Sequence, residues 1–266
     1  MEDTDILDIK KEVIKNSFLS TMTYYEYVGF NIGSWLVSKF VGKCPAVNGS
    51  AFAVKREVLT SLKGFRRVIA EDLDIAVRAF LKNYRFKYTK RVNVYNSVHS
   101  NWKNWLTQRK RWAIGCALWV KEWYRDLLKI CTKHPQVFIP SLLLLFPSII
   151  LILLYFFTPN LLIYKILSLI FLFLAVKLSF MVPILWLSTI SIDFIKSLLA
   201  SILSFLSFST MFFIFSKKLY FQFKLHEFLI YYFFYSPLGL FITIVALINV
   251  FLFDRKAMKI VSDWKI

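Results

Sequence analysis

A series of long apolar runs fills the second half of this chain and constrains its fold more than any other feature. Four runs follow one another with few charged residues: Val137–Phe157, Leu161–Ile190, Ser197–Phe215 and Phe228–Phe253. The first has 21 residues and no charge, enough for a helix that crosses the hydrocarbon core of a bilayer. Soluble cores rarely need four such runs in succession, so we predict four membrane-spanning helices. The mean hydropathy of +0.56 agrees with a membrane protein.

Basic residues are concentrated before the first apolar run. Residues 1–136 carry 24 Lys and Arg against 12 Asp and Glu, whereas residues 137–266 carry 10 against 4. By the positive-inside rule, we predict a multi-pass protein of the cell membrane whose N-terminal part and basic tail are both cytoplasmic. The same four-span layout places the loop that contains Lys217, Lys218 and Lys224 outside. This position disagrees with the positive-inside rule, because the loop is basic.

The first hundred residues have the pattern of a globular domain with mixed helices and strands. Alternation of apolar and polar residues over 84–98 predicts a strand. Asn48–Val58 reads as a short strand, Glu57–Leu62 as a short helix and Leu62–Phe65 as a turn, followed by a helix over 71–83. The predicted fold class is therefore α/β. No glycine-rich phosphate loop is present, which excludes a P-loop or dinucleotide-binding fingerprint.

Neither the cysteines nor the start of the chain indicates a secreted protein. Cys44, Cys116 and Cys131 form no CxxC pair and leave one odd thiol, so neither a disulfide framework nor a zinc site is predicted. Met1–Lys11 is acidic and polar, without the apolar core of a cleavable signal peptide.

Three acids are crowded at the start of the helix predicted over 71–83. Glu71, Asp72 and Asp74 fall within four positions of "AEDLDIAVRAF". Acids in a first turn interact favourably with the helix dipole and cap free backbone N–H groups. Taken alone, the stretch is therefore a helix cap rather than a catalytic site.

A basic, tryptophan-rich segment, Asn101–Ile130, joins the domain to the first apolar run. Its five tryptophans lie among Lys and Arg at helical spacing, which predicts an amphipathic helix at the membrane surface. We predict no nucleic-acid partner, because the adjoining spans favour lipid instead. Within it, "QRKRW" at Gln108–Trp112 groups a carboxamide, guanidinium groups and an indole. Guanidinium suits a diphosphate and an indole face suits a sugar ring.

An acidic pair at a helix start, a QxxRW motif some tens of residues later and several spans after it resemble a known family. They are similar to the membrane-embedded, processive branch of family 2 glycosyltransferases, which includes cellulose, chitin, hyaluronan and poly-N-acetylglucosamine synthases. The matching residues are Glu71, Asp72, Gln108, Arg111 and Trp112. Supporting matches are "NGSAFAVKREVL" from Asn48, "KGF" from Lys63 and "VSDWKI" from Val261. The resemblance covers the chain from about Glu26 to its end.

The resemblance implies an enzyme that transfers a hexose from a nucleotide-sugar donor to a glycan or lipid acceptor by inverting displacement. Asp72 would be the general base that takes the proton of the acceptor hydroxyl, and Glu71 would support its geometry. Gln108 and Arg111 would hold the diphosphate leaving group. Trp112 would form the floor under the terminal sugar of the acceptor.

The resemblance also implies a domain organisation in which membrane lipids are a partner. A partial GT-A-type catalytic domain would be followed by an interfacial helix, a transmembrane bundle and a cytoplasmic tail. The expected boundaries are 1–100 for the domain, 101–136 for the interfacial region, 137–253 for the bundle and 254–266 for the tail.

One expected part of the family pattern is missing. Relatives hold Mg²⁺ or Mn²⁺ on a D-x-D motif that follows nucleotide-binding strands. "DTD" at Asp3–Asp5 has no apolar strand before it and lies too close to Asp72, so we interpret it as a solvated acidic terminus and predict no metal ligand here. The chain then corresponds to the C-terminal part of such an enzyme. A truncated gene, a misplaced start codon or a split enzyme with a separate N-terminal half would each account for it.

Three functions stay open at this point. The first is a glycosyltransferase, or part of one, and the second is a non-catalytic remnant or scaffold subunit of a split enzyme. A transporter is a distant third, because Lys165 and Lys177 are the only ionisable groups well inside an apolar run and snorkelling explains both.

Overall fold

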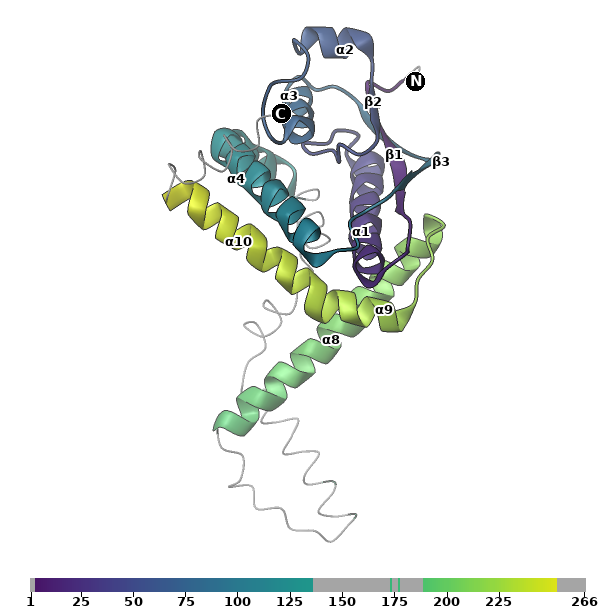
Figure 1. The fold of residues 1–266 in the computed structure, drawn as a ribbon, viewed down its shortest axis with the longest axis vertical. Coiled ribbons are helices and arrows are strands. Elements are labelled where there is room, and N and C mark those ends of the chain that lie inside the picture. The colour runs from purple at the N-terminus through teal and green to yellow at the C-terminus, as the bar shows by residue number, and fades with distance from the viewer. Residues whose placement is uncertain (1–2, 136–172, 174–176, 178–188, 253–266) are drawn as a thin grey trace. The chain divides into compact units, whose positions relative to one another are not determined.

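The computed structural model describes residues 3–135, 173, 177 and 189–252 of the chain (Figure 1). The chain divides into two compact units. The first combines Met1–Phe146 with Phe213–Ile266, and the second is Pro147–Phe212. All residues of the candidate site lie in the first unit.

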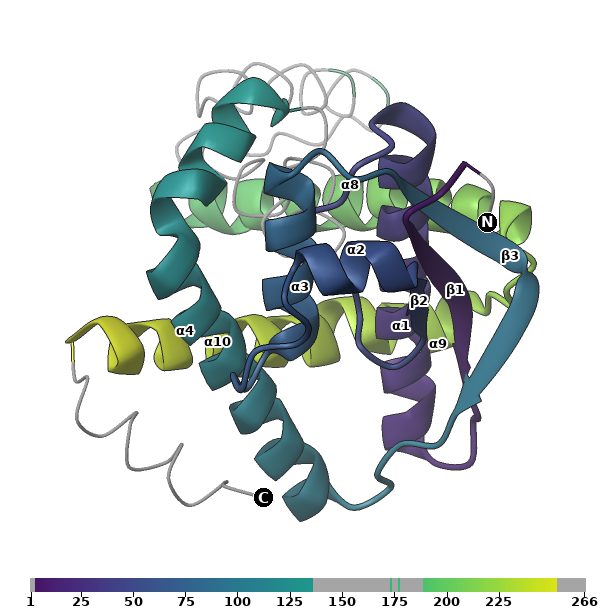
Figure 2. The same cartoon turned by 90° about the horizontal axis from the view of Figure 1, so that it is seen from above.

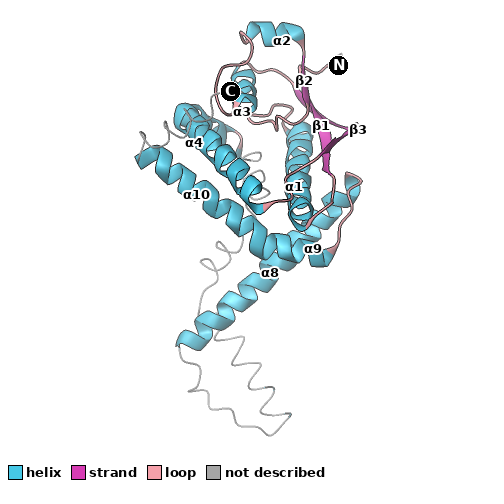
Figure 3. Ribbon diagram, viewed as in Figure 1, coloured by secondary structure: helices cyan, strands magenta, loops and turns pink. Residues whose placement is uncertain are grey.

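A three-stranded sheet in the order β2-β1-β3 forms one side of the first unit (Figure 3). The central strand β1 (Ile6–Val13) pairs antiparallel with β2 (Phe52–Val54), with Ile6 opposite Val54. It pairs in parallel with β3 (Phe86–Asn96), with Ile6 opposite Phe86. The strands predicted within 48–58 and 84–98 are thus confirmed.

Strand β1 has no recognisable strand pattern in the sequence, because polar residues fill much of it. Asp8 and Lys11 are buried and form an ion pair with each other. The backbone N–H of Lys11 donates to the Asn31 side chain at 3.0 Å. A buried charge is tolerated when it is paired and hydrogen-bonded, so this strand lacks the apolar alternation that sequence reasoning relies on.

Helix α1 (Phe18–Phe40) packs against β1 and β3. Ser17 caps it by accepting the backbone N–H of Ser20, and the Ser20 hydroxyl accepts the N–H of Ser17 in return. One stretch of this helix is aromatic and fully buried, with Tyr24 and Tyr25 in edge-to-face contact. In Figures 1 and 2, α1 and α3 lie between the sheet and α4.

The short elements after β2 form where the sequence predicts them. Helix α2 covers Arg56–Ser61 and α3 covers Glu71–Leu81. The turn between them contains Gly64 at φ 73°, a left-handed conformation that glycine adopts without a steric penalty. The apolar face of α3, with Ile75 and Ala76 fully buried, packs into the main core of the domain.

Helix α4 (Trp102–Lys133) confirms the helix predicted over 101–130, and it has two apolar faces. Asn101 caps it by accepting the backbone N–H of Lys103 at 2.8 Å. Toward the domain, its tryptophans pack with Val77 and Phe80. Toward the other side, its alanines pack with α10 (Ser236–Leu252), so that α4 lies between α3 and α10 (Figure 1).

Two helices are long and apolar enough to cross a membrane by length and composition: Ile195–Lys218 and Leu225–Leu252. The first belongs to α8 (Thr189–Lys218). The second consists of α9 (Leu225–Ile230), the π-helical turn η2 (Tyr231–Tyr235) and α10. They correspond to the third and fourth predicted spans. Val137–Phe157 and nearly all of Leu161–Ile190 lie outside the described residues, so four spans are not supported.

The loop between α8 and α9 packs on the globular domain, a contact that the predicted position of this loop outside does not fit. The Gln222 backbone N–H donates to the Tyr24 hydroxyl at 2.8 Å, and the Lys224 N–H donates to the Tyr25 hydroxyl at 3.0 Å. Lys10 donates to the Tyr220 carbonyl at 3.2 Å. The loop is therefore held against the domain by hydrogen bonds. Counting apolar runs does not predict this contact, because it treats every run as one full crossing.

Candidate functional site

Asp72 is the second residue of α3, and its carboxylate is held by two backbone N–H groups. Gly49 donates to Oδ2 at 2.6 Å and Leu73 donates to Oδ1 at 2.8 Å. Burial raises the pKa of the Asp72 carboxyl above its ordinary value, while the Gly49 N–H opposes that rise. The group is therefore an oriented carboxylate with increased basicity, as a general base requires.

The Asn48–Ser50 loop supplies this contact, and the sequence analysis did not assign it a role in the site. The Asn48 side chain accepts both the backbone N–H and the hydroxyl of Ser50, at 3.0 and 2.8 Å, which orders the loop. A Cβ atom on Gly49 would lie 2.8 Å from Asp72 Oδ2. Only glycine therefore fits at this position without displacing the carboxylate. The signal in the sequence was the Asn-Gly pair before β2.

Gly115 brings α4 up against the start of α3. A Cβ atom at this position would lie 2.9 Å from Cγ2 of Ile69 and 3.5 Å from Cβ of Ala70. The adjacent thiol of Cys116 has a pKa raised by burial and by the negative charge of Asp72. Residues 108, 112 and 116 follow one another at intervals of four and share one helix face. The structure thus brings the QxxRW segment to the side of Asp72.

We predict that Gly115→Ala destabilises the protein although alanine is the better helix former. The new methyl group meets the stiff, branched side chain of Ile69, and overpacking of this kind typically costs about 1–3 kcal/mol. Gly239→Ala in α10 is the matched control, because no atom lies within 4 Å of its added Cβ. The control should gain about 0.5–1 kcal/mol from helix propensity. Urea unfolding of both variants in detergent measures the difference, and equal shifts would contradict the close approach of α4.

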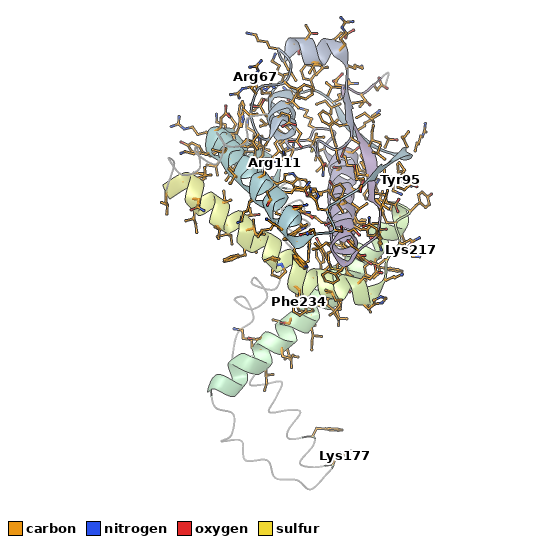
Figure 4. The ribbon with its side chains drawn as sticks, viewed as in Figure 1. Arg67, Tyr95, Arg111, Lys177, Lys217 and Phe234 are labelled. Carbon is orange, nitrogen blue, oxygen red and sulfur yellow. The ribbon has the colours of Figure 1, made fainter. Side chains whose placement is uncertain are left out.

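The three predicted residues of the QxxRW motif are half-buried on α4. Arg111, labelled in Figure 4, forms no salt bridge among the residues that the structure describes. Trp112 is covered on one ring face by the guanidinium of Arg109, whose Cζ lies 4.6 Å from the ring centroid. Gln108 lies one turn before Trp112 on the same face. A half-buried guanidinium of this kind can pair with an anionic leaving group.

Arg109 is a different kind of residue from Arg111, and the sequence analysis did not single it out. It is buried and pairs with Glu26 of α1. It also donates to the hydroxyl of Tyr235 at 3.0 Å, and that hydroxyl in turn donates to Glu26 at 3.1 Å. The Trp105 indole N–H donates to the same hydroxyl at 3.0 Å. This network joins α1, α4 and η2. It also fixes the position of the Arg109 guanidinium that covers the Trp112 ring.

The three acids of α3 have three different environments, and the interpretation of the cluster as a cap holds in part, because Asp72 accepts the first-turn N–H of Leu73. The residue at the helix N-cap is Ala70, which has no side chain for capping. Glu71 is exposed. Asp74 is buried and accepts from Arg66 at 2.9 Å and from Arg78 at 2.8 Å. Asp74 therefore ties α3 to the preceding loop, while Asp72 faces the Asn48–Ser50 loop.

We predict that Asp74→Asn costs stability rather than chemistry. Breaking a buried ion pair by removing one partner typically costs about 3–5 kcal/mol. Here the cost arises because Arg66 and Arg78 lose the negative charge that compensates their own. Glu71→Gln is the control, since an exposed substitution stays within about 0.5 kcal/mol. Thermal unfolding followed by circular dichroism tests both variants. A shift for Asp74→Asn no larger than that of Glu71→Gln would refute the assignment.

The acids at the start of the chain do not fit a divalent cation. Asp5 accepts the backbone N–H of Arg85 at 2.9 Å and pairs with Lys55 at 3.6 Å. Asp3 lies 3.9 Å from Arg85. No group of three or more His, Cys, Asp or Glu that could hold a metal ion exists within the described part of the chain. Asp5 therefore connects the residues just before β1 and β3 and is not merely solvated.

Comparison with known proteins places the chain in a family. The family described as "Glycosyl transferase family group 2" matches residues 12–253, and the chain belongs to this family. Similar relatives include a probable glucomannan 4-beta-mannosyltransferase of Oryza sativa, which is 32% identical over 109 residues. These residues are 41% of this chain and 18% of the relative.

Two further relatives are also named as glucomannan 4-beta-mannosyltransferases. A probable glucomannan 4-beta-mannosyltransferase of Arabidopsis thaliana is 34% identical over 83 residues, 31% of this chain and 16% of the relative. A glucomannan 4-beta-mannosyltransferase of Cyamopsis tetragonoloba is 30% identical over 115 residues, 43% of this chain and 20% of the relative. The matches thus span about a fifth or less of the length of these curated relatives.

Proposed function

We propose that this chain carries the general base and the leaving-group residues of a membrane glycosyltransferase. The observation that carries the proposal is the oriented, partly desolvated carboxylate of Asp72 next to the helix that bears Gln108, Arg111 and Trp112. The proposed reaction moves a hexose from a nucleotide sugar to a glycan or lipid acceptor, with inversion at the anomeric carbon. Membership of the family and the mannosyltransferase relatives support this reaction class.

In the proposed mechanism, Asp72 accepts the proton of the attacking acceptor hydroxyl. The acceptor oxygen forms a bond to the anomeric carbon while the bond from that carbon to the diphosphate oxygen breaks. The electron pair of the broken bond stays on the diphosphate, and the positive charge of Arg111 stabilises the negative charge that develops there. Gln108 donates a hydrogen bond to the same group, and Trp112 supports the apolar face of the acceptor sugar.

The base is prepared for this step by its surroundings. The N–H groups of Gly49 and Leu73 aim the two carboxylate oxygens. Partial burial makes the carboxylate a better proton acceptor than a solvated aspartate. Activation of the acceptor hydroxyl needs a side chain held in a fixed position. Glu71, the neighbour of Asp72, is exposed, so it supports the base in this scheme and does not replace it.

The relatives suggest a sugar for the first assay. They are named as mannosyltransferases that act on glucomannan, so nucleotide-activated mannose is the first donor to test, with nucleotide-activated glucose as the comparison. A β-linked mannan oligosaccharide is the matching acceptor. Incorporation of radiolabelled sugar into the acceptor measures transfer directly.

We predict that the purified 266-residue chain alone gives no turnover, and that turnover appears when nucleotide-binding strands are supplied in the same chain or in trans. The reason is that Asp5 is engaged by Arg85 and Lys55, so "DTD" at Asp3–Asp5 does not offer the metal ligand that the resemblance implies for the nucleotide site. Turnover by the isolated chain would contradict this prediction. If the chain transfers no sugar even when the nucleotide-binding strands are supplied, it is a scaffold subunit and not a catalytic one.

A further inference from the structure

The segment Leu225–Leu252 has the composition of a membrane span, but its contacts do not fit a crossing. It is long and apolar enough to pass from one face of a bilayer to the other, and no charged residue occurs between Phe228 and Leu252. Its orientation relative to the globular domain can be read from the residues that it touches. These residues lie at both of its ends and in its middle.

The first end of the segment is fixed to α1. Glu227 pairs with Lys15 at 2.9 Å and accepts the hydroxyl of Tyr25 at 3.0 Å. About two turns further on, the Tyr235 hydroxyl is enclosed by Trp105, Arg109 and Glu26. The segment therefore begins against the globular domain, at the level where α4 also begins.

The remainder of the segment stays beside α4. The buried side chains of Ala246 and Val250 pack against Ala113, Ile114 and Ala117 of α4. Lys121 donates to the carbonyl of Val250 at 3.3 Å. The contacts advance in the same order along both helices, from Trp105 with Tyr235 to Lys121 with Val250, over about 24 Å of helix axis.

The opposite side of α4 is bound to the globular domain along this stretch and beyond it. Gly115 touches Ile69, and Glu122 pairs with Arg66 at 2.7 Å. Between Trp105 and Glu122, α4 also exposes Lys110 and carries a half-buried Arg111. A crossing by α10 would draw α4, with these charges and the domain attached, through the hydrocarbon core, and charges there are costly.

We propose that Leu225–Leu252 does not cross the membrane but lies within one leaflet beneath α4, with lipid acyl chains as its partner. The face turned away from α4 is suited to this environment. Its exposed side chains recur every three or four residues: Phe234, Leu238, Phe241, Val245, Ile248 and Leu252. Phe234, marked in Figure 4, is 69% exposed and Leu252 is 71% exposed. Trp102 and Lys103 are exposed at the start of α4. At a membrane surface, lipid headgroups interact favourably with tryptophan and with cations.

Depth measurement by spin labelling tests the proposal independently of any glycosyl transfer. Cysteines are introduced singly at Leu238, Phe241, Val245, Ile248 and Leu252, in a full-length chain whose natural cysteines are replaced, and the protein is reconstituted in liposomes. Accessibility to oxygen and to a water-soluble nickel reagent gives the depth of each label. A helix that lies in one leaflet gives one common depth at all five positions. A crossing helix gives depths that pass through a maximum, because its axis advances about 21 Å from Leu238 to Leu252.

Labels at Leu198, Leu206 and Phe213 of α8 provide the comparison within the same protein, since α8 is the other helix of spanning length. Their depths should change along the helix. A second measurement locates the two ends of Leu225–Leu252. A cysteine at Tyr220, whose side chain is 74% exposed, and a cysteine added after Ile266 should react with an impermeant maleimide from the same side of the membrane. Reaction from opposite sides, or the absence of lipid contact along α10, would overturn the proposal.

Discussion

Replacing Asp72 by asparagine is expected to lower the rate of glycosyl transfer about 10²–10⁴-fold, the usual contribution of general-base catalysis, with little change in nucleotide-sugar affinity. The amide keeps the shape of the carboxylate but cannot accept the proton of the acceptor hydroxyl. It also loses a charge that the Gly49 N–H stabilises at 2.6 Å. Transfer kinetics with the complete nucleotide-binding half present, together with donor binding by calorimetry, measure the two effects separately.

The comparison variants make this expectation specific to Asp72. Arg111→Ala should weaken donor binding as well as the rate, because the proposed contact of Arg111 with the diphosphate would form before the reaction and strengthen during it. Glu71→Gln should retain most of the rate, since Glu71 is exposed. A fully active Asp72→Asn enzyme, or equal losses for Glu71 and Asp72, would place the base on another residue.

The pH dependence of the same reaction follows from the environment of Asp72. The base must be ionised, so the rate should rise with pH on the acid side. Because burial raises the pKa of Asp72, the midpoint of that rise should lie above the ordinary value of 3.8 for an aspartate carboxyl. A rate profile over the acid range checks the direction of the shift. A midpoint below the ordinary value would mean that the backbone N–H bonds outweigh burial.

The second large effect is expected at Arg109. Arg109→Met should lower the free energy of unfolding by about 3–5 kcal/mol, because it removes one partner of a buried ion pair and leaves Glu26 and Tyr235 without their cation. Lys110→Met, on the neighbouring exposed position, is the matched control and should stay within about 0.5 kcal/mol. Urea unfolding in detergent compares the two variants.

The double variant Glu26→Gln/Arg109→Met separates the loss of a pair from the loss of packing. If the cost arises mainly from an uncompensated charge, the double variant should be more stable than Arg109→Met alone. If the double variant is as unstable as the sum of both single variants, Glu26 and Arg109 do not act as a pair. Near-ultraviolet circular dichroism of Trp105 and Trp112 would show whether the aromatic surroundings of Arg109 change.

Several elements could be predicted from the sequence because local rules determine them. Helix α3 and strand β3 follow the helical and alternating patterns of their own residues, and the turn at Gly64 needs a residue that adopts a positive φ. The candidate residues Asp72, Gln108, Arg111 and Trp112 were recognisable because their types and spacing form a motif. Each of these inferences needs only residues that are close in the chain.

Other features depend on partners that are distant in the chain, and only the tertiary structure reveals them. Asp8 and Lys11 look like residues of a solvated terminus until β2 and β3 enclose the strand between them. Arg109 and Arg111 are indistinguishable in "QRKRW", yet Glu26, 83 residues away, pairs with Arg109.

Composition alone predicted a fourth span over Phe228–Phe253, because hydropathy measures the affinity of a helix for lipid and not its direction within it. Direction is set by neighbours. The sequence by itself determined strands β2 and β3, helices α2, α3 and α4, and the apolar segments. The fold decided which charges are paired, which carboxylate is oriented and which face of α10 is left for another partner, because burial and long-range contacts, rather than local pattern, set those free energies.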